Sequence, residues 1–125
     1  MRGASAIADI LKEHPGANVR VLAVWEPVLS TDWGTPSPTL TAMIPDRRVR
    51  YFYDRERRLS AMLGGKDNVT RLAREFQLGF RMQDVIWDIA LLYPPGAAWG
   101  APADLAVAPV VKNRDRLDAA VAKLP

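Results

Sequence analysis

The amino-acid sequence predicts one α/β domain over residues 1–125, with a three-layer α/β/α arrangement around a mixed sheet of about four strands. Two observations predict this class. Strand-like apolar runs at 19–25 and 49–53 are separated by helix-like segments, an order that produces parallel strands. The last third of the chain then reads as two strands and a helix, and the loop between those strands is compatible with antiparallel pairing.

The N-terminal segment is expected to form a helix over residues 5–14. Ile7, Ile10 and Leu11 recur there at the spacing of one helix face. The pair Pro15-Gly16 ends the helix, because proline cannot continue it and glycine favours a helix stop.

The run at 19–25 is almost continuously apolar, as expected for a central strand covered on both faces. A long loop over 26–36 follows it. Ser37 is then expected to cap a short helix that ends near Ile44, with Pro38 at the favoured first position.

The second strand, 49–53, is predicted from its β-branched and aromatic side chains. Asp54 is expected to cap a helix over about 55–63, which the pair Gly64-Gly65 ends. Another short helix is expected after Asn68. Its apolar stripe consists of Val69, Leu72, Ala73 and Phe76.

A third strand is predicted at 85–92, where the chain is largely apolar. The segment 96–108, rich in alanine, glycine and proline, is expected to be a loop, and 109–112 a short fourth strand. Asn113 is expected to cap the final helix. The apolar face of that helix carries Leu117, Ala120, Val121 and Leu124.

The composition excludes several kinds of chemistry. Without cysteine, the chain has no disulfide, no thiolate nucleophile and no cysteine-ligated metal, and its one histidine, His14, cannot build a multi-histidine metal site. No cofactor is indicated. No apolar run approaches the roughly 18 residues of a membrane span. A cytoplasmic location is expected if Met1 is the natural start, and export if a signal peptide was removed.

The order of elements, with its terminal β-β-α unit, resembles the thioredoxin-like fold over nearly the whole chain. The local match is a strand that ends at Trp25, followed by a loop containing Pro27 and then by a helix. Thioredoxins carry Cys-x-x-Cys in that loop and a cis-proline before their third core strand. Here the loop lacks cysteine, and no proline lies between Pro45 and Pro94. The resemblance therefore implies a redox-inactive member, similar to bacterial thioredoxin-like proteins with a Trp-Glu-Pro…Thr-Asp-Trp loop, for which it implies no known activity.

The candidate binding loop consists of Trp25, Glu26, Pro27, Asp32 and Trp33. It follows a strand at the end where α/β sheets gather their chemistry. Two carboxylates beside indoles could converge for acid–base work or for binding a hard cation. Alternatively, the glutamate accepts loop amide hydrogen bonds, the aspartate makes an Asx-turn and the tryptophans fill the core.

Asp88 and Trp99 are secondary candidates. Asp88 falls within the predicted third strand, where a carboxylate needs a partner such as Arg50, an exposed edge position or a raised pKa. Trp99 lies between glycines and prolines, so that it either contacts a partner or folds back over the sheet.

Arginines interleaved with aromatic residues mark the segment 47–58, a pattern that also suits single-stranded nucleic acid. Asp46, Asp54 and Glu56 reduce its charge, which favours a solvated helix face beside a strand edge.

The sequence favours a redox-inactive domain that binds a protein or peptide near the Trp25–Trp33 loop, without catalysis. The first alternative is an enzyme or cation-binding protein that uses Glu26 and Asp32. The second is weak nucleic-acid binding through the segment Arg47–Arg58.

Overall fold

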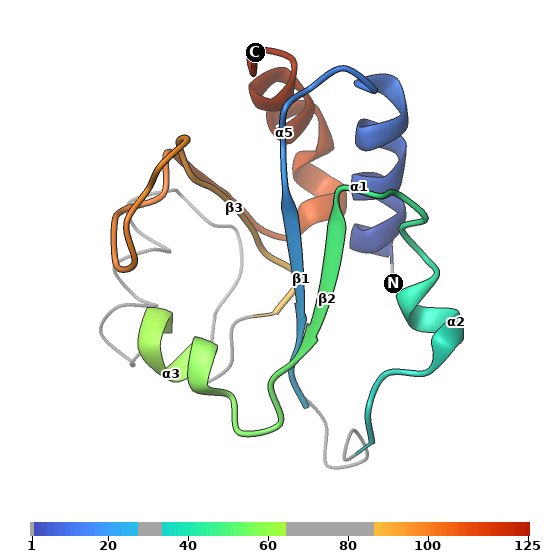
Figure 1. Ribbon diagram of the computed structural model, residues 1–125, viewed down its shortest axis with the longest axis vertical. Coiled ribbons are helices and arrows are strands. Elements are labelled where there is room, and N and C mark those ends of the chain that lie inside the picture. Colours follow the sequence, from blue (N-terminus) through green and yellow to red (C-terminus); the bar gives the residue numbers. More distant parts are fainter. Residues whose placement is uncertain (1, 28–33, 65–86) are drawn as a thin grey trace.

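The computed structural model describes residues 2–27, 34–64 and 87–125 of this mixed α/β chain (Figure 1). The predicted helix over 69–76 lies outside these residues. The described helices are α1 (Arg2–Glu13), α2 (Pro38–Thr41), α3 (Arg58–Gly64), the 3-10 helix η1 (Val110–Asn113) and α5 (Arg114–Val121). The described strands are β1 (Val21–Trp25), β2 (Val49–Tyr53), β3 (Ala90–Leu92) and β4 (Leu105–Val107).

The strands pair in the directions that the sequence predicts. β1 runs parallel to β2, with Val21 opposite Val49 and Trp25 opposite Tyr53. β3 runs antiparallel to β4. Among the described residues, these pairs form two separate two-stranded sheets and not the expected single sheet of about four strands.

Helix α1 contributes to two neighbouring apolar cores. On one side Ala6 and Ile10 pack with residues of β4, η1 and α5. On the other side Leu11 packs with Ile44 and with Val49 of β2. Burying an aliphatic side chain of this size contributes roughly 1.5–3 kcal/mol. In Figure 1, α1 and α5 lie beside each other at the top of the view, whereas α3 lies to the left of β1.

The expectation that β1 is covered on both faces is wrong for the described residues. Val21 and Ala23 pack on the core that α1 covers, whereas Leu22 and Val24 are 59% and 36% exposed. Side chains alternate between the two faces of a strand, and of the residues described here only those on the α1 face are packed in a core. In this part of the chain an unbroken apolar run therefore lies on a sheet with one exposed face.

Local capping signals in the middle of the chain are largely confirmed. Ser37 caps α2, and its hydroxyl accepts a hydrogen bond from the Leu40 N–H. Helix α3 begins later than predicted, because the chain first turns through Arg57, which has a φ of 55°. Asp54 still holds the start of α3, since its carboxylate accepts from the Leu59 N–H at 2.7 Å.

The C-terminal third differs from the prediction in its strand positions. The fourth strand is Leu105–Val107, in the predicted loop, while 109–112 enters the 3-10 helix η1. Pro109 has no N–H to donate to a sheet, and its carbonyl instead accepts from the Lys112 N–H. Asn113 directly precedes α5, but its side-chain amide donates to the carbonyls of Ala108 and Pro109.

The predicted third strand is shorter than expected in its described part. Residues 85 and 86 lie outside the described residues, and β3 begins only at Ala90. Asp88 has a φ of 52°, a left-handed conformation that no strand residue adopts. This conformation turns the backbone immediately before β3.

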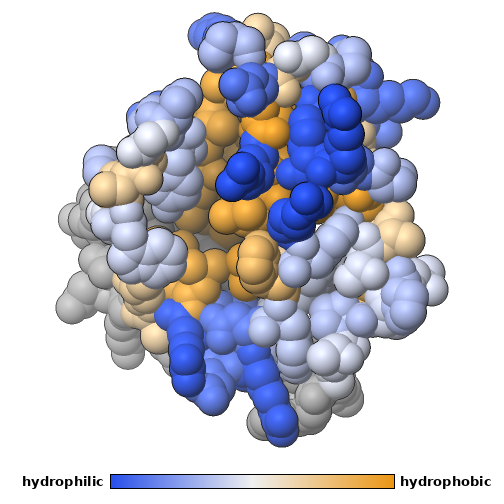
Figure 2. Space-filling model, viewed as in Figure 1, coloured by the Kyte–Doolittle hydropathy of each residue, from blue (hydrophilic) through white to orange (hydrophobic). Residues whose placement is uncertain are grey.

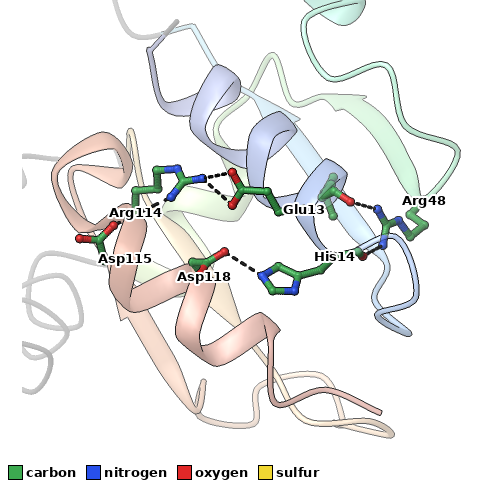
Figure 3. Close-up of polar contacts among 7 residues, drawn as sticks. Glu13, His14, Arg48, Arg114, Asp115 and Asp118 are labelled. Carbon is green, nitrogen blue, oxygen red and sulfur yellow. Dashed lines mark hydrogen bonds and ion pairs between the residues drawn. The ribbon is translucent and has the colours of Figure 1, made fainter.

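Polar contacts at the C-terminal end of α1 hold three elements together (Figure 3). Arg48, which directly precedes β2, donates to the carbonyls of Leu11 at 2.6 Å and His14 at 2.8 Å, and its Nη2 lies 2.7 Å from Asp46. A cation at this end also complements the helix dipole. His14 Nε2 lies 2.8 Å from Asp118 of α5.

Asp46 makes the stability of this junction depend on pH. The hydrogen bonds from Arg48 lower the pKa of Asp46 from 3.8 to about 2. The ionised carboxylate therefore stabilises the fold fully above pH 3.8, and this contribution is lost as the pH falls through 2. We expect Asp46→Asn to lower the free energy of unfolding by about 1–2 kcal/mol at pH 7.

Urea unfolding of both proteins between pH 7 and pH 2 measures this contribution. The two curves are expected to converge at the acid end, and Asp9→Asn, an exposed aspartate of α1, serves as the control. A constant difference down to pH 2 would contradict the assignment.

Candidate functional site

The candidate loop reaches the described structure only in its first residues. Glu26 turns toward α3, where its carboxylate accepts hydrogen bonds from the Ser60 N–H at 3.0 Å and from the Ser60 hydroxyl. Ser60 is 2% exposed. Asp32 and Trp33 lie outside the described residues. Glu26, the described member of the predicted Glu26–Asp32 pair, is thus bonded to the start of α3.

Trp25 and Pro27 flank this glutamate in the interior. Pro27 is buried, and the indole of Trp25 is partly buried at the end of β1. The Trp25 Nε1–H is shielded from water and has no hydrogen-bond partner within the described part of the chain. An unpaired buried donor opposes folding, so the packing of the rest of the indole has to offset this cost.

Asp54 sits beside Glu26 and completes the polar start of α3. Burial alone would raise the pKa of the Asp54 carboxyl, but hydrogen bonds from the backbone N–H groups of Leu59, Arg58 and Glu56 hold it below its usual value. Asp54 is therefore ionised at neutral pH. Its own N–H donates to the Trp25 carbonyl at 2.8 Å, which joins the ends of β1 and β2.

Asp88 lies against the first turn of α1. A Cβ added to the buried Gly3 would overlap the Asp88 carboxylate, so the two groups approach closely. Loss of water around this carboxyl raises the pKa of Asp88. No ion pair joins it to Arg50 in the described structure. A carboxylate near a helix N-terminus interacts favourably with the helix dipole, but the raised pKa of Asp88 means that the loss of water outweighs the favourable interactions.

The arginine segment divides into paired and unpaired members. Arg48 is paired with Asp46, and the exposed Arg58 donates to Glu56 at 2.7 Å. Arg50, on the exposed face of β2, donates to the carbonyls of Arg47 and Val49 and has no carboxylate partner within the described ranges. The segment is therefore no uniform cationic surface.

An apolar hollow of about 340 Å³ opens at the carboxyl ends of β1 and β2. It brings together β2, α3 and the connection between β3 and β4. The residues that line it are Phe52, Tyr53, Asp54, Arg58, Leu59, Met62 and Trp99. In Figure 2 apolar side chains gather over the centre of the molecule, in a hollowed surface with hydrophilic groups above and below.

Trp99 is the most exposed of the large apolar side chains described, at 81%. It sits in a turn that Gly96 and Gly100 allow through their positive φ angles of 75° and 84°. Phe52 and Met62, at 50% and 38% exposure, line the same hollow. Trp99 is therefore exposed in the same hollow as Phe52 of β2, and its contact with a partner stays a prediction.

Sequence reasoning had identified Trp99 but not Phe52, Leu59 and Met62. The sequence signal that could have identified Phe52 was the alternation of side chains along β2, which puts Arg50 and Phe52 on one face of the strand and Tyr51 on the other. That signal does not say which face is covered, because the covering helix α1 is distant in the sequence.

A second hollow, of about 620 Å³, lies between α1 and the turn before β2. Leu11 and Ile44 form its apolar part, and Asp46 and Arg48 line it as well. Because these two charges are bonded to each other, and Arg48 also donates to the Leu11 carbonyl of α1, this hollow is part of the junction described above.

Other site classes have no support in the described ranges. No three histidine, aspartate or glutamate side chains gather there to hold a metal ion. None of the described helices is long and apolar enough to cross a bilayer.

No family model, curated protein or solved structure matches the chain.

Glu26 is expected to stabilise the folded state. Glu26→Ala removes the carboxylate that accepts hydrogen bonds from the Ser60 N–H and hydroxyl, so we expect a loss of about 1–3 kcal/mol in the free energy of unfolding. Ser60→Ala, which removes only the hydroxyl, should cost less. Chemical denaturation measures both, and a Glu26→Ala protein as stable as the wild type would disprove this role.

Proposed function

We propose that this chain is a redox-inactive, thioredoxin-like domain that binds a protein or peptide partner in the hollow lined by Phe52, Met62 and Trp99. The exposure of Trp99 carries the proposal. Contiguous exposed apolar side chains are costly in water and mark interaction surfaces. Tryptophan is also among the residues that contribute most to binding energy.

The position of the hollow supports the site expected from the sequence. It begins at Asp54, whose N–H binds the carbonyl of Trp25 at the end of β1. The carboxyl ends of parallel strands are the usual place for ligands in open α/β sheets. The binding surface thus adjoins the start of the candidate loop.

The thioredoxin-like relationship is proposed on the order and direction of the strands. The parallel pair β1–β2 precedes the antiparallel pair β3–β4, and α5 follows. The chain contains no cysteine, so it cannot carry out thiol–disulfide exchange by itself. A partner-binding role needs neither thiols nor converging catalytic groups.

A peptide selection tests the proposal. Phage-displayed random peptides are selected on the full chain, and the affinities of the synthesised winners are measured by fluorescence anisotropy. Trp99→Ala is expected to weaken binding about tenfold or more. Because Trp99 is largely exposed, the free energy of unfolding should change by no more than about 0.5 kcal/mol.

Tyr93→Ala is the matched control, since this exposed aromatic residue does not line the hollow. Unchanged affinities in Trp99→Ala, or equal losses in Tyr93→Ala, would refute the proposed surface.

A further inference from the structure

The open face of the β1–β2 sheet extends the hollow along both strands. The register puts Leu22 opposite Arg50 and Val24 opposite Phe52. These four side chains are exposed and project from the face opposite α1. Phe52 also lines the hollow, so the apolar surface is continuous from Leu22 to Trp99.

The two ends of this surface differ in charge. Arg50 and the exposed Arg20 lie at its N-terminal end, because Arg20 precedes Leu22 by two residues. Neither arginine has a carboxylate partner among the described residues. At the other end Arg58 is paired with Glu56, and Asp54 is bonded to the start of α3. In the described part of the chain, Arg20 and Arg50 thus present positive charge on the open face itself, whereas the charged residues that line the hollow, Asp54 and Arg58, are both bonded.

We infer that the partner is an extended peptide segment that places apolar side chains over Val24, Phe52 and Trp99 and acidic side chains at Arg20 and Arg50. The inference rests on the proposed function and names the partner's chemistry. Side chains two residues apart in an extended peptide are about 7 Å apart. Arg50 and Phe52 are also two residues apart along β2. A peptide with an acidic residue two positions from an apolar one can therefore place the acidic side chain at Arg50 and the apolar one over Phe52.

Charge and surface chemistry favour a peptide over a nucleic acid. Opposite Arg50 lies the aliphatic Leu22, and Val24 follows it on the same face, whereas single-stranded nucleic acid is bound by aromatic side chains interleaved with cationic ones. The aromatic Phe52 and Trp99 instead line the hollow, next to the ionised Asp54. The ionised Asp54 in the hollow would repel a phosphate backbone. A carboxylate at the Arg20–Arg50 end would instead accept charge-assisted hydrogen bonds.

Three synthetic peptides test the inference. Each alternates threonine with leucine or phenylalanine, and two positions near one end carry glutamate, glutamine or lysine. On the full chain we expect the glutamate peptide to bind about tenfold more tightly than the glutamine peptide, and the lysine peptide to bind most weakly. The preference for glutamate should decline with salt.

Arginine variants test which residues cause the preference for the glutamate peptide. Arg20→Gln combined with Arg50→Gln should make the glutamate and glutamine peptides bind equally, while Arg116→Gln on α5 should keep the preference. Trp99→Ala should weaken all three peptides. If all three bind the wild type equally and Trp99→Ala still weakens them, the inference fails and the proposed function stands. If Trp99→Ala changes none of the affinities, the proposed function fails as well.

A photocrosslinking residue in place of Leu22 identifies what lies on the face. Crosslinks to the glutamate peptide support the inference. Crosslinks to a second copy, or to another segment of the same chain in the presence of the peptide, overturn it. Displacement of the bound peptide by oligothymidylate would show that the surface binds nucleic acid, which also overturns it.

Discussion

The packing of α1 is the constraint on which the described structure depends. Ile10 and Leu11 are neighbours in the sequence, and each is almost fully buried in a different apolar cluster. One cluster joins α1 to β4, η1 and α5, and the other joins it to β1 and β2. Ile7 packs against both clusters. Because one helix serves both cores, it fixes the parallel pair relative to the C-terminal elements.

Polar groups at the end of α1 support this arrangement. Arg48 binds helix carbonyls that have no partner within the helix, while Arg114 of α5 holds Glu13 at 2.7 Å. The exposed Glu13–Arg114 pair contributes little to stability, because water and salt screen its charges. The partly buried Arg48 is more consequential, because removal of its side chain takes the donor from the Leu11 carbonyl and leaves Asp46 with the Arg48 backbone N–H alone of its Arg48 donors.

The position of α1 also explains the open surface. A parallel sheet is normally covered on both faces, and α1 covers only one face of β1–β2. Leu22, Val24 and Phe52 are left on the other face, next to Trp99 through the shared hollow. An apolar surface of this kind, with unpaired arginines at one end, is the physical basis of both proposals.

The sequence predicted features that depend on local chemistry. The bounds of β2 followed from its β-branched and aromatic residues, and Ser37 capped α2 as its type and the following proline indicated. Contacts between distant residues could not be predicted in this way. The bonds from Glu26 to Ser60 span 34 positions, and which face of β1 is covered depends on α1. Likewise, β4 was missed because alanine and proline around Leu105–Val107 indicate a loop, while pairing with β3 makes it a strand.

The exposure of the β1–β2 face to solvent is the central claim, and a soluble paramagnetic gadolinium chelate tests it directly. Methyl relaxation is measured by NMR on the full chain without a partner. The methyl groups of Leu22 and Val24 are predicted to relax strongly, while those of Ile10 and Val107, which are at most 2% exposed, remain protected. Protection of Leu22 and Val24 equal to that of Ile10 would show that the face is already covered, and would contradict the account.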